Sequence, residues 1–471
     1  MVFLDKAEKQ PGRYLICKNV NGRASGVIAG ELFREFWHGF THRRSEIQLE
    51  TCDELIFAVG DAAIPDLQDA EYAINVETEG FAVVSKSEEG LKRGFMTLLD
   101  RIHPTDDEGA VAYLDCCILR ESPRIGVRMV HFCVFPETEL YHLKRFLRFA
   151  AALKYTHVVV EFWGMLKLEC LPELAWSFAF SKDEVRPIFE EARELGVEIV
   201  PMFNHWGHAS QSRSIHGKHV VLDQDPTLVT LFAEGGWCWK ISDRRVRELF
   251  RKIRAELIDI VGDGEYFHIG CDEADGYDIG DTALREQVVE FLNEVAEDLG
   301  RYGRRPIMWG DMLIYNYPHY NKENKYYCTA PSEECEKDVF NKLDSRIVIA
   351  DWQYLPTKVP VETSLKIQSY GRDCLTCPFD FGVSKLAAAQ NTVADYGLFG
   401  FIHTTWHRLS TGMHFVAMAA AGGYAQLPDD ETKVVNDYRI AAADTLRRVL
   451  GADGVYEHAG WSKNQVGSFV T

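Results

Sequence analysis

The sequence predicts an α/β fold, namely a (β/α)₈ TIM barrel with a smaller N-terminal α+β domain and a C-terminal helix. The chain has 471 residues, more than one ordinary domain, and 46% of them are hydrophobic, enough for a large core. After Ser122-Pro123-Arg124, short apolar runs alternate with amphipathic helical segments, which is typical of a barrel. The sequence before this point lacks that alternation. We therefore place the domains at residues 1–122, 123–425 and 426–471.

The N-terminal domain is expected to combine strands with a helix. Residues 55–60 form an apolar run typical of a strand, and residues 71–76 and 80–85 are expected to pair as antiparallel strands. A helix is predicted over residues 87–102, because the apolar residues from Leu91 to Ile102 recur on one helical face. This pattern indicates a separate α+β unit beside the barrel.

Eight apolar runs are predicted to form the barrel strands. They span residues 125–135, 157–163, 197–204, 266–273, 306–311, 347–354, 365–370 and 399–407. The clearest helices between them are predicted at residues 139–153, 182–195, 244–261 and 282–302. The interval from 354 to 365 is too short for a full helix, so the later units are expected to be irregular. A last helix, over about residues 430–450, is expected to pack against the barrel.

Composition and charge exclude several classes of partner. With 51 basic and 71 acidic residues, the formal net charge of −20 argues against nucleic acid or an anionic membrane as the main partner. The first residues lack the pattern of a signal peptide, and no run approaches the ~20 apolar residues of a membrane span. We therefore expect a cytoplasmic protein whose twelve cysteines, including the pair in Cys374-Leu375-Thr376-Cys377, are reduced packing residues.

The segment from Tyr266 to Glu273 carries the clearest functional signal. It has the pattern of a short buried strand that ends in two adjacent carboxylates, Asp272 and Glu273. Because strand side chains alternate, His268, Gly270 and Asp272 are expected on one side, with Gly270 leaving room for a ligand. A salt-bridged pair at a strand end is the purely structural alternative. The neighbouring histidine and glycine favour a catalytic site.

Other polar and aromatic residues fall at the ends of the predicted strands, where a barrel of this class places its active site. In chain order they are Arg128, His131, Glu161, Trp163, Asn204, His205, His208, Asp272, Glu273, Trp309, Asp311, Asp351, Trp352, Tyr354, Tyr370, Trp406 and His407. Tryptophans at several strand ends suit a sugar, because the C–H faces of a pyranose stack on aromatic rings. The sequence therefore indicates a carbohydrate site.

These motifs resemble glycoside hydrolase family 20, the exo-acting β-N-acetylhexosaminidases. His268–Glu273 resembles the family's His-x-Gly-x-Asp-Glu signature, and Pro123–Arg128 resembles the segment that opens the family's barrel. Pro201–His208 resembles the third-strand motif that ends in Gly-His, and residues 71–74 and 90–98 are similar to the family's accessory domain. The resemblance implies retaining hydrolysis of terminal N-acetylhexosamine. It also implies that the nucleophile is the substrate's own acetamido group, which closes to an oxazolinium ion.

The resemblance also implies roles for the site residues. Glu273 would act as general acid and then as base, while Asp272 would orient the acetamido N–H and stabilise the oxazolinium. A tyrosine should hold the acetamido oxygen, with Tyr370 the first choice and Tyr354 the second. His208 and His268 are expected to orient carboxylates, and Arg128 to bind sugar hydroxyls. The other substrate-binding candidates are Glu161, Trp309, Trp352, Trp406 and Arg408.

Three positions depart from the family's pattern. The second strand has Glu161-Phe162-Trp163 in place of a His-x-x-x-Asp motif, and Asn204 stands where the family usually has aspartate. The last strand closes with Trp406-His407-Arg408 in place of Trp-x-Glu. These differences bear on the identity of the sugar. Arg408 would either favour an anionic substituent or point away from the site, and we slightly prefer the second interpretation.

Three other functions are considered. The first is a retaining β-glycosidase with Glu161 as nucleophile and Glu273 as acid/base, acting on a sugar without a 2-acetamido group. The second is a metallohydrolase whose ligands would be His131, His205, His208, His268 and Asp311. The first strand lacks the His-x-His pair that such an enzyme would need. The third is a sugar-binding protein without turnover, which the presence of both carboxylates disfavours. We expect no cofactor and no metal, an oligosaccharide or glycoside as substrate, and a homodimer as a candidate assembly.

Overall fold

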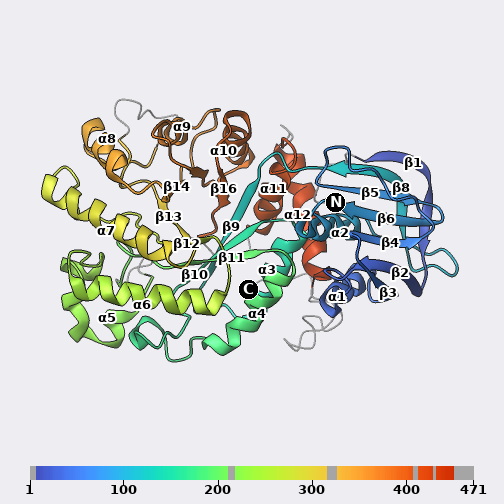
Figure 1. Ribbon diagram of the computed structural model, residues 1–471, viewed down its shortest axis with the longest axis horizontal. Helices are drawn as coiled ribbons and strands as arrows, with labels where there is room; N and C mark the ends of the chain where they lie inside the picture. Colours follow the sequence, from blue (N-terminus) through green and yellow to red (C-terminus); the bar gives the residue numbers. More distant parts are fainter. Residues whose placement is uncertain (1–6, 211–217, 316–325, 407–411, 428–430, 450–471) are drawn as a thin grey trace.

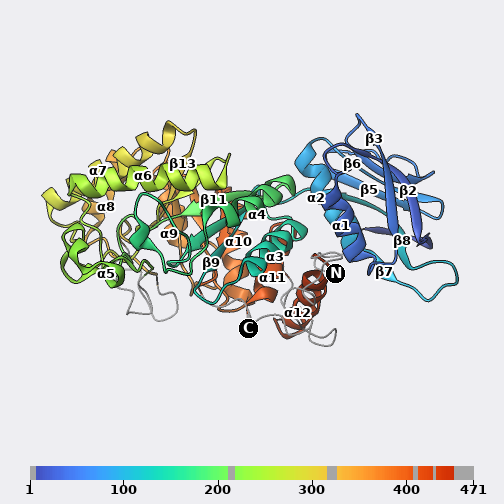
Figure 2. The ribbon, with the colours of Figure 1, turned by 90° about the horizontal axis from the view of Figure 1, so that it is seen from below.

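The computed structural model describes residues 7–210, 218–315, 326–406, 412–427 and 431–449. A sheet domain lies at one end of the molecule and a barrel surrounded by helices at the other (Figure 1). The last helix, α12 (Glu431–Arg448), lies between the two (Figures 1 and 2). No helix of the described residues combines the length and apolar character needed to cross a membrane.

The N-terminal domain is a mixed sheet covered by two helices. Its strands lie in the order β1-β8-β5-β6-β4-β2-β3, and β7 pairs with β8. They span β1 (Glu8–Ile16), β2 (Asn19–Ser25), β3 (Glu46–Cys52), β4 (Ile56–Gly60), β5 (Tyr72–Glu77), β6 (Gly80–Ser85), β7 (His103–Pro104) and β8 (Ala112–Glu121). The pair β5–β6 is antiparallel as predicted, while β2 and β3 run parallel. Helices α1 (Glu31–Phe40) and α2 (Glu88–Asp100) cover the face of the sheet that is turned toward the barrel (Figure 2).

The second domain is a closed barrel of parallel strands, which confirms the predicted fold class. The strands follow one another around the barrel in chain order, and the last pairs with the first. They span β9 (Val127–Val134), β10 (His157–Phe162), β11 (Glu198–Met202), β12 (Tyr266–His268), β13 (Arg305–Trp309), β14 (Val348–Asp351), β15 (Cys374–Thr376) and β16 (Gly400–His403). Parallel strands present all their carboxyl ends at one mouth of the barrel, so residues that follow different strands can meet there.

Helices and helical turns form the outer layer of the barrel. They span α3 (Leu140–Ala152), η1 (Pro172–Leu174), α4 (Lys182–Glu194), α5 (Val221–Gln224), η2 (Pro226–Leu231), η3 (Glu234–Gly236), α6 (Arg244–Val261), α7 (Thr282–Gly300), α8 (Glu333–Lys342), α9 (Glu362–Ser369), α10 (Val383–Tyr396) and α11 (Met413–Gly422). Local sequence sets where several of them begin. Ser181 and Glu184 form a capping box at the start of α4, and the Asp281 carboxylate accepts the Leu284 N–H at the start of α7.

One predicted strand is wrong. Residues 365–370 lie at the end of helix α9 and just after it, and the seventh barrel strand is β15 instead. The hydroxyls of Thr363 and Ser364 donate to the buried Asp351 carboxylate, at 2.7 and 2.6 Å, and so tie the first turn of α9 to the end of β14. Ile367 is buried one helical turn further on, so the apolar run is one face of a helix.

The barrel interior is a core of its own. Its buried apolar side chains include Met129, Val159, Val200, Ile307, Val348 and Ile402. Trp309 and Trp352 belong to the same cluster, and Tyr354 and Trp406 pack against it. These four aromatic residues therefore belong to the inside of the barrel and its mouth, which is the placement that a role in the site requires.

A buried polar network joins the two domains. The Lys154 ammonium, which follows α3, pairs with Glu121 of β8, donates to the Tyr72 hydroxyl at 2.8 Å, and lies 3.9 Å from the centre of the Tyr424 ring. The Lys154 and Glu121 side chains are 0% and 3% exposed. Burial lowers the pKa of Lys154 to about 8 although Glu121 opposes the shift. The ammonium therefore depends on its partners at the domain interface.

We predict that Lys154→Met lowers the free energy of unfolding by about 3 to 5 kcal/mol, because it removes the cation that faces the buried Glu121 carboxylate. Lys154→Met combined with Glu121→Gln should recover much of this loss, since no net charge is then left in the interface. Urea titrations followed by tryptophan fluorescence would measure both. A double variant as unstable as the single one would contradict the prediction.

Candidate active site

The candidate residues after four of the barrel strands meet at the carboxyl end of the barrel. Trp309 ends β13, and its ring centre lies 5.6 Å from that of Trp406, which follows β16. The Trp406 indole donates to the Tyr354 hydroxyl at 2.6 Å, and Tyr354 follows β14. The carboxylates Asp272 and Glu273 follow β12. The barrel thus brings together residues far apart in the sequence.

The backbone of the carboxylate motif is not a strand beyond His268. Gly270, Cys271 and Glu273 have φ values of 66°, 76° and 44°, so the expected alternation of side chains fails in this segment. Gly270 also does not leave room for a ligand: a Cβ there would lie 2.0 Å from Oδ1 of Asn204. Glycine is required at this position because the Asn204 side chain fills the space.

Asp272 is buried, and its two oxygens have different surroundings. Oδ2 lies 3.2 Å from Nε2 of His208 and 3.9 Å from Nζ of Lys218. Oδ1 is buried and has no hydrogen-bond partner among the residues that the structure describes. Burial alone would raise the pKa of Asp272, but Lys218 and then His208 lower it to about 2. Asp272 is therefore an ionised carboxylate with one buried oxygen that lacks a donor.

Glu273 is the accessible member of the pair, with 43% of its side chain exposed. Its Oε2 lies 3.1 Å from Nε2 of the same His208 that contacts Asp272. Its backbone is held on both sides, since its N–H donates to Asp311 at 2.9 Å and its carbonyl accepts the Trp237 indole N–H at 2.7 Å. The Glu273 side chain can therefore reach a ligand from a fixed backbone.

His208 connects the two carboxylates. Asp272 and Glu273 raise its pKa to about 9, against the effect of burial, so the ring is an imidazolium at neutral pH. The ring packs on Trp237, with 4.5 Å between the ring centres. The preceding Gly207 is needed because a Cβ there would lie 2.1 Å from the Asp272 carbonyl oxygen. The Gly-His pair of the motif thus fits the histidine closely against the carboxylates.

Asp311 links Glu273 to Trp352. Its Oδ2 accepts the Glu273 N–H and its Oδ1 accepts the Trp352 indole N–H, both at 2.9 Å. Burial and the charge of Asp272 raise the pKa of Asp311 to about 7. From the sequence, Asp311 is a strand-end residue whose only suggested role is that of a ligand in the metallohydrolase alternative. Its contacts show that it fixes the positions of two other candidates.

His268 is buried and packs against Trp309. Its ring centre lies 4.3 Å from that of Trp309, and its Nδ1 accepts the Gly270 N–H at 3.0 Å. Burial lowers the pKa of His268 to about 3, so the ring is neutral and carries its proton on Nε2. Within the part of the chain that the structure describes, no hydrogen bond or ion pair joins His268 to the side chain of Asp272 or Glu273, so the expected carboxylate-orienting role falls to His208.

Glu161 is fully buried and surrounded by donors. The Asn204 amide, the Trp163 indole, the Lys218 ammonium and the His131 ring lie 2.6, 3.0, 2.9 and 3.3 Å from its oxygens. Burial alone would raise the pKa of Glu161, but Lys218 and His131 hold it well below the usual range. Lys218 was not among the sequence candidates, since a lysine outside any motif gives no signal of burial at a site.

Two sequence candidates lie elsewhere, which corrects their expected roles. Arg128 is near the start of β9, at the opposite end of the barrel, where its guanidinium donates to the carbonyls of Ile125, Gly126 and Lys154 and to the Tyr424 hydroxyl. Those bonds occupy all of its N–H groups. Tyr370 follows α9 in the outer layer, where its hydroxyl donates to Glu336 at 2.7 Å. Arg408 lies outside the described residues.

The five residues of the metallohydrolase hypothesis do not share one site. His205, for example, contacts the Phe203 carbonyl at 2.6 Å and Arg254 at 3.1 Å. Within the described ranges, the group with suitable spacing for a metal is His131, Cys133 and Glu161.

That group fits a metal poorly. The His131 ring accepts the Thr405 N–H on Nδ1 at 3.5 Å, which places its proton on Nε2, the nitrogen that faces Glu161. Burial and Glu161 also raise the pKa of the Cys133 thiol well above its usual value, whereas a metal binds the thiolate. We therefore assign no metal to these residues.

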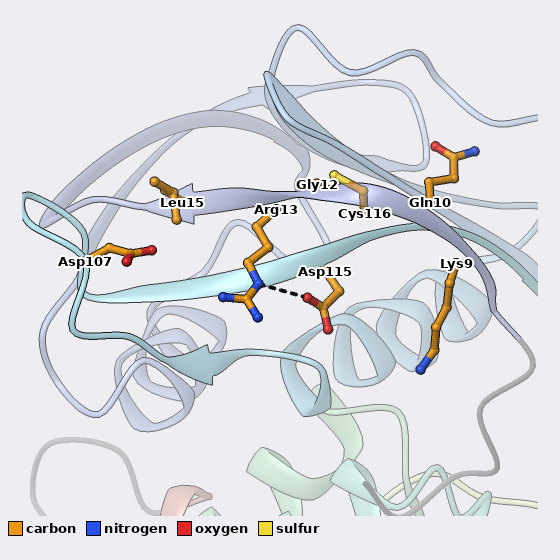
Figure 3. A pocket seen from close by; sticks show the side chains of 8 residues that line it. All are labelled: Lys9, Gln10, Gly12, Arg13, Leu15, Asp107, Asp115 and Cys116. Carbon is orange, nitrogen blue, oxygen red and sulfur yellow. Dashed lines mark hydrogen bonds and ion pairs between the residues drawn. The ribbon is translucent and has the colours of Figure 1, made fainter.

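A separate hollow of about 630 Å³ lies on the N-terminal sheet (Figure 3). Arg13 of β1 and Asp115 of β8 form a 3.3 Å ion pair across it, with side chains that are 53% and 56% exposed. Such an exposed pair contributes little energy and needs no ligand. We assign no substrate to this hollow.

Comparison with known proteins agrees with the geometry. Residues 164–355 match the model of glycosyl hydrolase family 20, catalytic domain. This range includes His208, Asp272, Glu273, Trp309 and Tyr354. No curated protein matches the chain in sequence.

Several solved structures share the fold at low sequence identity. Flavobacterium johnsoniae chitobiase is 16% identical with a TM-score of 0.67, over 98% of this chain and 74% of that one. The β-N-acetylhexosaminidase from Bacteroides fragilis is 16% identical with a TM-score of 0.65, over 98% and 97%. A mutant Streptomyces plicatus β-hexosaminidase in complex with its product GlcNAc is 14% identical with a TM-score of 0.65, over 97% and 94%.

The motif order, the closed barrel and the match over residues 164–355 all lead to the same assignment. The protein is a glycoside hydrolase whose residues 164–355 are similar to the catalytic domain of glycosyl hydrolase family 20.

Proposed function

We propose that the protein is an exo-acting β-N-acetylhexosaminidase, which hydrolyses terminal N-acetylhexosamine residues with retention of configuration. In this proposal the substrate's 2-acetamido oxygen attacks C1 and forms an oxazolinium ion. The observation that carries the proposal is the state of Asp272: an ionised carboxylate with Oδ2 held by His208, and a buried Oδ1 that has no partner among the described residues. An acetamido N–H is the kind of donor that this oxygen lacks.

The proposed roles follow from the contacts. Asp272 accepts the acetamido N–H through Oδ1, turns the acetamido oxygen toward C1, and stabilises the positive charge that forms on the ring. Glu273, with its exposed side chain, protonates the leaving oxygen and afterwards takes a proton from the attacking water. His208 lies within 3.2 Å of both carboxylates and limits their mutual repulsion.

A tyrosine is proposed to hold the acetamido oxygen, and Tyr354 now replaces Tyr370 as the candidate. The Tyr354 oxygen accepts the Trp406 indole N–H, and its O–H is the donor proposed for the acetamido oxygen. Trp309, Trp352 and Trp406 are proposed to form the apolar wall against which the sugar and its acetyl methyl group pack.

The contacts of Glu161 disfavour the alternative in which it is the nucleophile. Such a nucleophile needs a carboxylate oxygen that faces C1 of the sugar. The Glu161 side chain is 1% exposed, and four donors surround its two oxygens. Both Glu161 oxygens are thus occupied by protein donors, which disfavours Glu161 as a nucleophile.

We predict that the wild type hydrolyses p-nitrophenyl β-N-acetylglucosaminide and leaves the β-glucoside intact. Asp272→Asn and Glu273→Gln should each lower kcat by roughly 10²- to 10⁴-fold, since each removes a group that acts on the reacting atoms. Asp115→Asn, at an exposed carboxylate of the N-terminal sheet, is the matched control and should keep full activity. Hydrolysis of the plain glucoside would favour Glu161 as nucleophile, and binding without turnover would indicate a sugar-binding protein.

The two tyrosines provide a second prediction. Tyr354→Phe should lower kcat on the order of 10²-fold, because it removes a donor to the oxygen that becomes the nucleophile. Tyr370→Phe, which only loses the bond to Glu336 in the outer layer, should leave kcat unchanged. Steady-state kinetics of both variants on the acetamido substrate would measure this. Equal losses in the two would refute the assignment to Tyr354.

Asp311 gives a prediction on pH dependence. Its pKa is about 7 in the folded protein, against an ordinary value of 3.8, so the folded state binds this proton more tightly than the unfolded state. The stability that Asp311 contributes is present below pH 3.8 and is lost as the pH rises through 7, at about 1.4 kcal/mol per pKa unit.

Asp311→Asn removes this titration, so the fall in melting temperature from pH 4 to pH 7 should be smaller in the variant. The comparison concerns slopes, because the lost bonds to Glu273 and Trp352 lower the whole curve. Parallel melting curves for wild type and variant across this range would contradict the prediction.

A further inference from the structure

Lys218 is a buried cation at the catalytic carboxylates that no motif indicated. Its backbone N–H donates to the His208 carbonyl at 3.2 Å, and the next N–H, of His219, donates to the Ala209 carbonyl at 3.0 Å. The chain at residues 218–219 is thus fixed beside the segment that carries His208. The Lys218 side chain is only 2% exposed.

The Lys218 ammonium lies between two carboxylates. Nζ is 2.9 Å from Oε1 of Glu161 and 3.9 Å from Oδ2 of Asp272. Two further contacts limit its position: Oδ1 of Asn204 at 3.5 Å, and the face of Trp406, whose centre lies 4.8 Å away. Lys218 therefore pairs closely with Glu161 and acts on Asp272 from the longer distance.

We propose that Lys218 is a positioning residue for Asp272. In this proposal, which rests on the proposed function, its ammonium attracts Oδ2 of Asp272, keeps the carboxylate ionised and leaves Oδ1 directed to the substrate's acetamido N–H. Glu161 is the anchor that keeps the ammonium from moving onto Asp272.

The difference between the two distances of the Lys218 ammonium, 2.9 Å to Glu161 and 3.9 Å to Asp272, matters for the chemistry. An ammonium paired directly with Asp272 would neutralise the carboxylate that must stabilise the oxazolinium charge. With Glu161 bound at 2.9 Å, the ammonium stays 3.9 Å from Asp272, close enough to favour its charged form but not paired directly with it. Glu161 thus has a role in this chain that does not require contact with the sugar.

The proposal predicts different effects for the two partners. Lys218→Met removes the cation, so the acid limb of the kcat/KM–pH profile should move up by about 1 to 3 pH units. Glu161→Gln leaves the cation free to pair with Asp272, so the limb should stay at low pH while kcat falls, roughly 10²-fold. A loss of folded structure alone would produce neither difference in the pH profile.

A double variant keeps the proposal testable if a single variant fails to fold. Lys218→Met with Glu161→Gln leaves no uncompensated charge, and should fold and show the upward shift of the acid limb. The matched control is Lys366→Met, which removes a lysine 2.9 Å from Glu336 in the outer layer and should change neither kcat nor the profile. A double variant with the wild-type acid limb and kcat would overturn the proposal.

A second measurement does not depend on turnover. In the wild type, the stability contributed by Asp272 is present above pH 3.8 and is lost as the pH falls through about 2. Asp272→Asn should therefore lower the melting temperature at pH 5 to 6 when it is introduced into the wild type. When it is introduced into the Lys218→Met/Glu161→Gln variant, it should lower the melting temperature less, or raise it.

An equal effect of Asp272→Asn in both backgrounds would overturn the role of Lys218. If the wild type does not hydrolyse the acetamido substrate, the proposed function is contradicted. The comparison of melting temperatures would still show whether Lys218 controls the ionisation of Asp272.

Discussion

The whole site depends on keeping buried carboxylates charged at the mouth of the barrel. An unpaired ionised carboxylate in such surroundings costs far more energy than a protein of this size can spare, and the usual result is protonation. Two cations prevent that here. The Lys218 ammonium contacts the carboxylates of Glu161 and Asp272, and the His208 imidazolium contacts those of Asp272 and Glu273. The two cations and three carboxylates form one connected cluster in which Asp272 stays ionised.

The fold supplies the positions that this cluster needs. Closing the barrel places the ends of β10 and β12 and the segment after β11 at one mouth, so that Glu161, Asp272 and His208 can meet. The irregular backbone after His268, with positive φ at three of the next five residues, then turns both carboxylates away from the strand direction. Asp311 holds that backbone through the Glu273 N–H and ties it to Trp352. Burial, together with the nearby charge of Asp272, raises the pKa of Asp311 to about 7.

The sequence predicted the barrel, and it also predicted several residues that gather at its mouth, because the relevant signals are local. Asp272, Glu273 and His208 lie in short motifs, and the tryptophans lie at the ends of apolar runs. Arg128 was misplaced because a strand's sequence does not say at which end of the barrel a residue lies, and Arg128 is the second residue of β9. Tyr370 was misplaced because a short apolar run fits a strand and a buried helix face alike. Lys218 was missed because its value comes from contacts with Glu161 and Asp272, which lie 57 and 54 positions away.

The proposed role of Asp272 is to direct the substrate's own acetamido oxygen to C1. The most direct measurement compares kcat/KM for p-nitrophenyl β-glucosaminides whose 2-acyl group is acetyl, fluoroacetyl, difluoroacetyl or trifluoroacetyl. Each fluorine withdraws electrons from the carbonyl oxygen, so an enzyme that uses this oxygen as nucleophile must slow steeply along the series. We expect that steep fall. A flat series would mean that a protein carboxylate attacks C1, and would contradict this account of Asp272.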